Sequence, residues 1–416
     1  MEDIRTAFLH YSAPPVIGGV EAVMTAHARV FLAAGYPVVF FAGEGSEDAL
    51  PGGAEMRLIP EISTQHSEVL AIQKDLDHGR IPETFNEMRE RLVDLLRPLL
   101  ADIDVLIVHN IFTKHFNLPL TAALFDLIEE GVIQRCISWG HDFTWTSPNS
   151  RKKVFPGYPW DLLKKPHPRI KQVTISAQRQ KELAGMMGIA ENSISVIYNG
   201  VDLRMLHGIS EEGWALIERL DLLADDIIII LPVRVTTAKN IELAEQVVRA
   251  LKASNRQPHL VITGPPDPHN ADSMAYYQSL IAMREKLGVG GEVNFAFESG
   301  PDGGVPYYLS EQVVSDLMRV SDVLLLPSHR EGFGMPVLEA GLIGLPVVSS
   351  DSVPAAREIG GTDVRLFKTD ESPEAVARII QDVLDLNPIA RLRRRTRQNF
   401  RWERIFSQQI EPLLKG

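Results

Sequence analysis

The sequence has one cysteine, Cys136, so neither a disulfide nor a cysteine-rich metal site can form within the chain. Its apolar neighbours predict that this thiol packs in a core. Long apolar runs are missing as well. The longest, residues 227–233, is far shorter than the roughly 20 residues that a membrane helix needs, and Glu2 and Asp3 stand where a signal peptide carries cations. We therefore expect a cytoplasmic protein without an integral membrane segment.

Positive charge is not in excess. The formal net charge is -12, which argues against nucleic-acid partners, because phosphate backbones are bound by clustered lysines and arginines. Residues 391–404 hold seven arginines, and their helical composition predicts a solvated helix face rather than an RNA-binding tail. The remaining composition, 45% hydrophobic and 23% charged over 416 residues, is typical of two globular domains.

Short runs rich in valine and isoleucine alternate with helix-length segments along the chain, which is typical of parallel sheets covered by helices. The expected strands are residues 4–10, 37–42, 105–110, 135–139, 172–176 and 194–197, and then 226–233, 259–263, 292–297, 323–327, 346–350 and 364–367. The expected helices include residues 21–34, 83–100 and 240–253. We expect an α/β fold of two doubly wound Rossmann-like domains facing each other across a cleft, where the loops after the strands would bind ligands.

The turn-forming residues 198–202 (YNGVD) predict the hinge between these domains. The expected division is residues 1–198 for the first domain and 199–388 for the second. Residues 389–416 are expected to form a helical segment that packs back toward the first domain.

The loop after the expected strand 323–327 concentrates the residues that suit a phosphate site. Pro336 fits the first turn of a helix, and Gly332 and Gly334 allow the preceding backbone to approach a ligand. Free N–H groups and the helix dipole then favour an anion. Glu331 could bind sugar hydroxyls and Glu339 a ribose diol; the alternatives are a turn carboxylate and an ordinary exposed helix residue.

Glu331 and Glu339, with seven residues between them in EGFGMPVLEA, resemble the E-x7-E signature of retaining GT-B glycosyltransferases, in particular family 4. Further motifs resemble that family in the same order along the chain: Gly18-Gly19, His141-Asp142, Asn199-Gly200-Val201-Asp202, Arg234 and Lys239-Asn240. The resemblance spans essentially the whole chain and is weakest over residues 46–90 and 142–171.

The resemblance implies a retaining hexosyltransferase of the glucose or mannose type. Such an enzyme moves a hexose from a UDP-, GDP- or ADP-sugar to an acceptor hydroxyl by a front-face reaction that needs no metal and no other cofactor. The first domain would bind the acceptor and the second the nucleotide sugar. The implied catalytic residues are His141, Arg234, Lys239 and Glu331, and the implied substrate-binding residues are Gly18, Gly19, Asn199, Gly332, Phe333, Gly334, Val337, Leu338 and Glu339.

Arg234 and Lys239 suit this chemistry, because cations fixed beside a departing diphosphate stabilise the transition state and substitute for a metal. Asp102-Ile103-Asp104 has the spelling of the Asp-x-Asp motif of metal-dependent transferases, but it precedes a strand and is better explained as a helix-to-strand connection. His109 and His115 lack a third metal ligand at a recognisable spacing. The alternatives are an epimerase or hydrolase on the same fold, or a non-catalytic sugar-nucleotide-binding partner.

Residues 143–171 combine many cations and aromatics with one acid near them, Asp161. The cations are Arg151, Lys152, Lys153, Lys164, Lys165, Arg169 and Lys171, and the aromatics are Phe143, Trp145, Phe155, Tyr158 and Trp160. One hypothesis is a lid that recognises an anionic or glycosylated acceptor. A solvated loop pinned by its aromatics and a peripheral contact with an anionic membrane are the alternatives.

Overall fold

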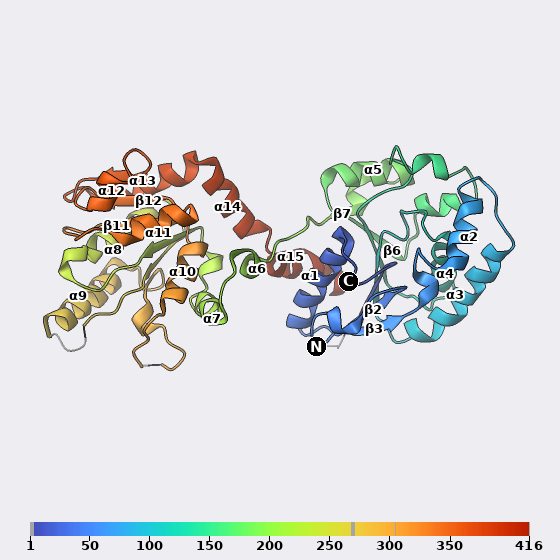
Figure 1. Cartoon of the computed structure of the whole chain (residues 1–416), viewed down its shortest axis with the longest axis horizontal. Helices are drawn as coiled ribbons and strands as arrows, with labels where there is room; N and C mark the ends of the chain where they lie inside the picture. The colour runs from blue at the N-terminus through green and yellow to red at the C-terminus, as the bar shows by residue number, and fades with distance from the viewer. Residues whose placement is uncertain (1–3, 268–270, 304, 416) are drawn as a thin grey trace. The chain divides into compact units, whose positions relative to one another are not determined.

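The computed structural model describes residues 4–267, 271–303 and 305–415, and the chain divides into two units. Unit 1 comprises Met1–Gly200 and Trp402–Gly416, and unit 2 comprises Val201–Arg401. Each unit has its own parallel sheet with helices around it (Figure 1). The expected α/β architecture of two Rossmann-like units, the GT-B fold, is thereby confirmed, whereas the expected cleft stays a prediction.

The sheet of unit 1 has seven strands in the order β3-β2-β1-β4-β5-β6-β7, which extends the 3-2-1-4-5 order of Rossmann-like folds. The strands are β1 (Thr6–Leu9), β2 (Val38–Ala42), β3 (Glu55–Leu58), β4 (Val105–His109), β5 (Cys136–Gly140), β6 (Ile170–Thr174) and β7 (Ile194–Val196). The helices are α1 (Gly19–Ala33), α2 (Ser67–Leu76), α3 (Thr84–Leu100), α4 (Leu118–Glu129), α5 (Ala177–Met187), α15 (Trp402–Ile405) and α16 (Glu411–Lys415). Strand β1 has a neighbouring strand on each side, because Thr6 pairs with Val38 of β2 and with Val105 of β4.

The end of the chain packs in unit 1. The rings of Phe406 and Phe31 lie 4.9 Å apart, and Trp402 is buried in the same cluster of side chains. A Cβ atom on Gly200 would approach the Trp402 ring to 2.7 Å, so glycine is required where the chain leaves the unit. The expected segment 389–416 is therefore divided between the two units, with residues 402–416 in unit 1 and residues 389–401 in unit 2.

The sheet of unit 2 has six strands in the order β10-β9-β8-β11-β12-β13, which is the same 3-2-1-4-5-6 topology. The strands are β8 (Ile227–Leu231), β9 (Pro258–Ile262), β10 (Val293–Phe295), β11 (Val323–Leu326), β12 (Val347–Ser350) and β13 (Arg365–Phe367). The helices are α6 (Leu203–His207), α7 (Glu211–Arg219), α8 (Ile241–Ala253), α9 (Ala271–Leu287), α10 (Glu311–Val320), α11 (Met335–Ile343), α12 (Pro354–Glu358), α13 (Pro373–Leu386) and α14 (Pro388–Asn399).

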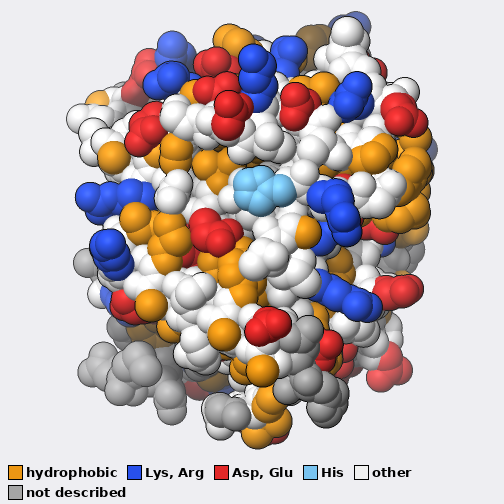
Figure 2. Space-filling model, turned by 90° about the vertical axis from the view of Figure 1, so that its left-hand side faces the viewer, with side chains coloured by type: hydrophobic (Ala, Val, Ile, Leu, Met, Phe, Trp, Pro, Cys, Tyr) orange, Lys and Arg blue, Asp and Glu red, His pale blue; other side chains and the backbone are white. Residues whose placement is uncertain are grey.

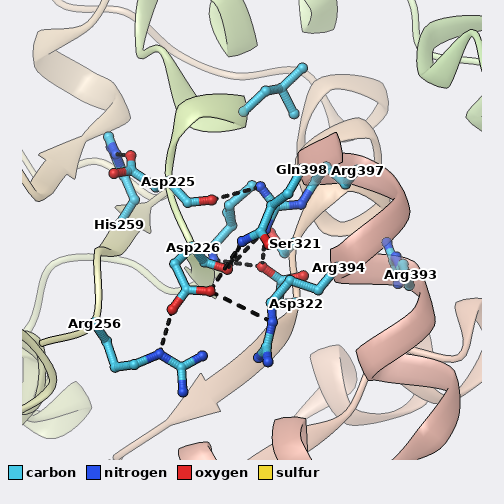
Figure 3. A network of polar contacts seen from close by, with 12 residues as sticks. Asp225, Asp226, Arg256, His259, Ser321, Asp322, Arg393, Arg394, Arg397 and Gln398 are labelled. Carbon is cyan, nitrogen blue, oxygen red and sulfur yellow. Dashed lines mark hydrogen bonds and ion pairs between the residues drawn. The ribbon is translucent and has the colours of Figure 1, made fainter. Parts of the chain in front are cut away.

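The arginine-rich helix α14 is anchored to the amino ends of the strands of unit 2 (Figure 3). Arg397 is buried and donates to a carboxylate oxygen of Asp322 at 2.6 Å, and the same oxygen accepts the N–H of Ile228 at 2.8 Å. Removing one partner of such a buried pair typically costs about 3–5 kcal/mol. The expected solvated face is correct for the exposed Arg391 and Arg395 but wrong for Arg397, which stabilises the fold.

The face drawn in Figure 2 carries charged side chains of both signs, as the composition of the sequence predicts. On the face drawn in Figure 2, Lys and Arg side chains are interspersed with Asp and Glu and with small apolar patches. A continuous positive surface of the kind that binds phosphate backbones is absent from the described residues of that face. None of the helices in the described ranges combines the length and apolarity that crossing a bilayer requires.

Most strands lie within two residues of the predicted ranges at each end, but β3 was not predicted and the start of β6 was placed too late. Strand β3 was not expected, because it lies at the edge of its sheet and only Met56 of its four residues is buried. Strand β6 begins at Ile170, two residues before the predicted segment, because Ile170 pairs with Cys136 of β5. The prediction that Cys136 packs in a core is confirmed, and burial raises the pKa of its thiol.

Candidate active site

Two of the predicted catalytic residues meet in unit 2, at the carboxyl ends of β8 and β11. Lys239 ends a short 3₁₀ turn (Thr237–Lys239) after β8, and Glu331 lies in the loop after β11. The N–H of His329 donates to the carbonyl of Ala238 at 2.9 Å and joins the two loops. The Lys239 ammonium and the Glu331 carboxylate form an ion pair in which each side chain is 18% exposed. The fold therefore places a partly desolvated cation and anion side by side.

The turn before α11 presents backbone donors. Gly334 has a φ of +102°, and a Cβ atom there would lie 2.5 Å from the Val353 side chain, so only glycine fits. The carbonyl of Phe333 accepts the N–H of Ala355 at 2.8 Å, which fixes the turn. The N–H groups of Gly332 and Phe333 have no acceptor within residues 4–267, 271–303 and 305–415. Unpaired donors at a helix N-terminus favour an anion.

Arg234 lies beyond the end of β8, where its side chain is exposed and has no partner in the described part of the chain. Its loop is packed closely on the end of β9, because a Cβ atom on Gly264 would lie 2.3 Å from the carbonyl oxygen of Val233. Arg234 is therefore a free cation at the same edge of the sheet as Lys239.

The remaining predicted residues of unit 2 lie on α11. Glu339 is exposed and lines a pocket of about 390 Å³ between α10 and α11, together with Glu311 and Met318. Leu338 is 37% exposed, whereas Val337 is buried in the core at 5%. The N–H of Val337 donates to the carbonyl of Gly334 at 3.0 Å.

The predicted residue His141 follows β5 in unit 1. Its N–H donates to the side-chain oxygen of Asn110 at 2.8 Å, and Asn110 adopts a φ of 61° just after β4. The Nε2 atom of His141 lies 3.1 Å from Nδ1 of His109. Burial lowers the pKa of His141 to about 4, so the imidazole is neutral at neutral pH.

His10 and Glu21 join this site without having been predicted. Nδ1 of His10 donates to the carbonyl of His109 at 3.0 Å, and Oγ of Ser12 donates to Glu21 at 2.5 Å. The Glu21 carboxylate folds over Gly18, where a Cβ atom would lie 2.1 Å from its Oε2. His10 directly follows β1, and His109 ends β4. This shared place at the strand ends is the sequence signal that could have identified His10 as part of the site.

The two glycines of the predicted Gly18-Gly19 pair differ. Gly18 caps α1, and a Cβ atom there would displace the end of the Glu21 side chain, whereas nothing lies within 4 Å of a Cβ atom on Gly19. Asn199 is exposed after β7, and its side chain makes no hydrogen bond to another described residue. His141 and Gly18 therefore lie at one sheet edge of unit 1. Asn199 takes no part in the hydrogen bonds that join the residues there.

The aromatics of residues 143–171 pack within unit 1. Trp160 is buried, and Nε1 of Trp145 donates to its carbonyl at 3.2 Å. The Arg151 guanidinium and the Lys164 ammonium lie 4.3 and 4.2 Å from the centre of the Trp145 ring. Lys153 forms an ion pair with Asp77 at 2.9 Å. These contacts favour the alternative of a loop pinned by its aromatics over the acceptor lid.

The segment Asp102-Ile103-Asp104, which has the Asp-x-Asp pattern, lies at the end of the strands opposite to His141. Asp104 accepts the N–H of Arg5 at 2.7 Å, and the Arg5 guanidinium pairs with Asp102 between α3 and β4. This agrees with the expected helix-to-strand connection. Among the residues that the structure describes, no three His, Cys, Asp or Glu side chains form a group that could hold a metal ion.

Each unit holds a parallel Rossmann-like sheet, which is the architecture of the GT-B class of glycosyltransferases. Residues 17–204 match the sequence model described as Glycosyltransferase Family 4, and residues 214–401 match the model described as Glycosyl transferases group 1. The chain therefore belongs to the family 4 type of glycosyltransferases.

Among curated proteins, the chain is similar to a D-inositol 3-phosphate glycosyltransferase of Rhodococcus opacus, with 26% identity over 148 residues, 35% of this chain and 30% of that protein. It is also similar to a mannosylglucosylglycerate synthase of Petrotoga mobilis, with 25% identity over 284 residues and 63% of each chain. The chain thus spans about a third of the former and under two thirds of the latter. A solved structure of Anabaena Alr3699/HepE in complex with UDP covers 99% of this chain and all (100%) of its own, at 16% identity and a TM-score of 0.36.

Proposed function

We propose that the chain is a retaining hexosyltransferase that moves a glucose- or mannose-type hexose from a nucleotide-diphosphate sugar to an acceptor hydroxyl. The observation that carries the proposal is the Lys239–Glu331 ion pair beside the free amides of Gly332 and Phe333, with Arg234 unpaired at the same sheet edge. Family membership supports it.

Unit 2 would bind the donor. Arg234, Lys239 and the amides before α11 would bind the diphosphate, Glu331 the sugar hydroxyls and Glu339 the ribose. Breaking the sugar–phosphate bond leaves a second negative charge on the diphosphate, which fixed cations and N–H groups stabilise more than they stabilise the ground state. Glu331 holds the Lys239 ammonium in place before this charge develops. The cations would supply the stabilisation that a metal ion supplies in other transferases.

Unit 1 would bind the acceptor beside His141. A neutral imidazole can lie near the positive charge that develops at the anomeric carbon, whereas a protonated one would oppose it. The bond from the anomeric carbon to the phosphate oxygen breaks, and the acceptor oxygen bonds to the same face of the carbon. The acceptor proton moves to the departing phosphate oxygen, so no protein base is required.

The donor assay combines thermal shift and turnover. We expect one of UDP-, GDP- or ADP-hexose, and its free diphosphate, to raise the melting temperature. Turnover with an acceptor should persist in EDTA and give a product with the anomeric configuration of the donor, read by NMR. Loss of turnover in EDTA with recovery on Mg²⁺ would overturn metal independence. Consumption of the donor at the same rate without acceptor would identify a hydrolase or epimerase, and binding without turnover a silent partner.

A further inference from the structure

Lys114 lies in the loop after β4, at the same edge of the sheet as His141. The N–H groups of Thr113 and Lys114 donate to the carbonyl of Asn110 at 2.9 and 2.8 Å. The side-chain oxygen of Asn110 accepts the N–H groups of His141 and Asp142 at 2.8 and 3.2 Å. A single residue, Asn110, thereby joins the turn that carries Lys114 to the segment that carries His141.

The neighbours of Lys114 are fixed on both sides. The carbonyl of Thr113 accepts the N–H of Thr144 at 2.9 Å, and the hydroxyl of Thr144 accepts the N–H of His115 at 3.1 Å. The backbone of Lys114 is therefore held against the loop after β5. Its ammonium lies 4.8 Å from the centre of the Phe116 ring.

The Lys114 side chain is half-buried, and its ammonium has no ion pair or hydrogen bond to any residue within 4–267, 271–303 and 305–415. Burial lowers its pKa, Asp142 raises it and Arg179 lowers it, which places both charged groups near the ammonium. A partly desolvated cation without a carboxylate partner is costly unless an anion compensates it.

Asp142, the carboxylate that raises the pKa of Lys114, is itself paired with another cation. Arg179 on α5 pairs with Asp142 at 3.0 Å and with Glu182 at 2.7 Å. In contrast with Lys114, Lys153 and Lys164 of the basic stretch each have a carboxylate partner. Of these three lysines of unit 1, Lys114 is the one that forms no ion pair with a described carboxylate.

We propose that Lys114 binds an anionic oxygen group, a phosphate or a carboxylate, on the acceptor and so directs the acceptor hydroxyl toward His141. This proposal rests on the proposed function. The acceptors would then be small hydroxyl compounds that carry a phosphate or a carboxylate.

Competitive acetylation tests the site without a known acceptor. Brief treatment with acetic anhydride, followed by peptide mass spectrometry, compares Lys114 with Lys181, an exposed lysine on α5. Three probes share one sugar ring: glucose 6-phosphate, glucuronate and neutral glucose. We expect one or both anions to slow acetylation of Lys114 about tenfold at ten times their Kd, because the reagent modifies the free form. Protection by phosphate alone or carboxylate alone decides between the two groups.

Equal protection by glucose, equal protection of Lys181, or no protection by either anion would overturn the proposal. The kinetic arm uses Lys114→Met, Lys114→Arg and, as the matched control, Lys181→Met. For an anionic acceptor that the wild type uses, Lys114→Met should raise KM about tenfold or more, leave the donor KM unchanged and be partly rescued by arginine. Normal donor binding and turnover with an unprotected Lys114 refutes this inference alone, whereas absence of donor binding refutes the proposed function.

Discussion

The Lys239 ammonium and the Glu331 carboxylate form an ion pair between loops that are 92 positions apart in the sequence. Each side chain is only 18% exposed, so removing either one leaves its partner uncompensated in a partly desolvated place. In the proposed mechanism the pair fixes the ammonium before the diphosphate arrives, which reduces the reorganisation that charge stabilisation requires.

Lys239→Met and Glu331→Gln should each lower kcat by about 10²–10³, because each removes a fixed charge that acts on the reacting sugar or diphosphate. The double variant should be little worse than the poorer single variant, since the two residues act as a unit. Steady-state kinetics with the donor found by thermal shift gives these values, and circular dichroism melting checks that the variants remain folded. Independent, multiplicative losses would contradict the coupling.

Arg234→Ala should lower kcat/KM for the donor by about 10–10², because a free guanidinium at the end of β8 would no longer meet the diphosphate. Arg234→Lys should recover part of this loss, since lysine keeps the charge but not the planar fork. The matched control is Arg378→Ala, an exposed arginine on α13. Donor kinetics for Arg234→Ala within twofold of the control would remove Arg234 from the site.

The fold was predictable where burial produces a strong pattern. Strand β8 is buried at all five residues, Ile227–Leu231, and therefore reads as a continuous apolar run. Strand β3 produces no such pattern, because an edge strand with exposed Glu55, Arg57 and Leu58 needs few apolar residues. The start of β6 was missed for a related reason: its register depends on pairing with β5, which a single segment does not reveal.

Most of the residues proposed to bind the donor lie in one short segment, Glu331 to Glu339, after a strand, so a sequence pattern is enough to propose them. Lys114 could not be proposed in this way, since it belongs to no local motif and its lack of an ion pair with the described residues is a property of the folded unit, in which Asp142 pairs with Arg179. The lysines of the basic stretch suggested an acceptor lid, but their ion pairs and ring contacts form only in the folded unit.

Two alanine variants of one turn test two different roles of glycine. Gly332→Ala tests whether a ligand approaches the backbone, and Gly334→Ala tests whether the backbone conformation needs glycine. Gly334→Ala should lower the free energy of unfolding by about 1–3 kcal/mol, because alanine at a φ of +102° is strained and its Cβ would meet Val353. Gly332→Ala meets nothing within 4 Å and should melt like the wild type, while its donor KM rises. Urea unfolding and donor kinetics measure both effects; an unchanged donor KM for Gly332→Ala would show that the ligand does not approach this backbone.

His27→Leu should make unit 1 more resistant to acid. The imidazole is fully buried, its two nitrogens have no partner in the described part of the chain, and its ring lies 4.7 Å from Trp139. Burial, with a smaller effect of His141, lowers its pKa to about 3, from an ordinary value of 6.5. Between these values the unfolded chain binds a proton that the folded chain does not, so stability falls as pH falls below 6.5. Leucine removes this term, and its gain in unfolding free energy should be about 2 kcal/mol larger at pH 5 than near pH 7.5. Urea unfolding at both pH values, with the exposed His78→Gln as the control, measures the difference; a gain independent of pH would contradict the protonation argument.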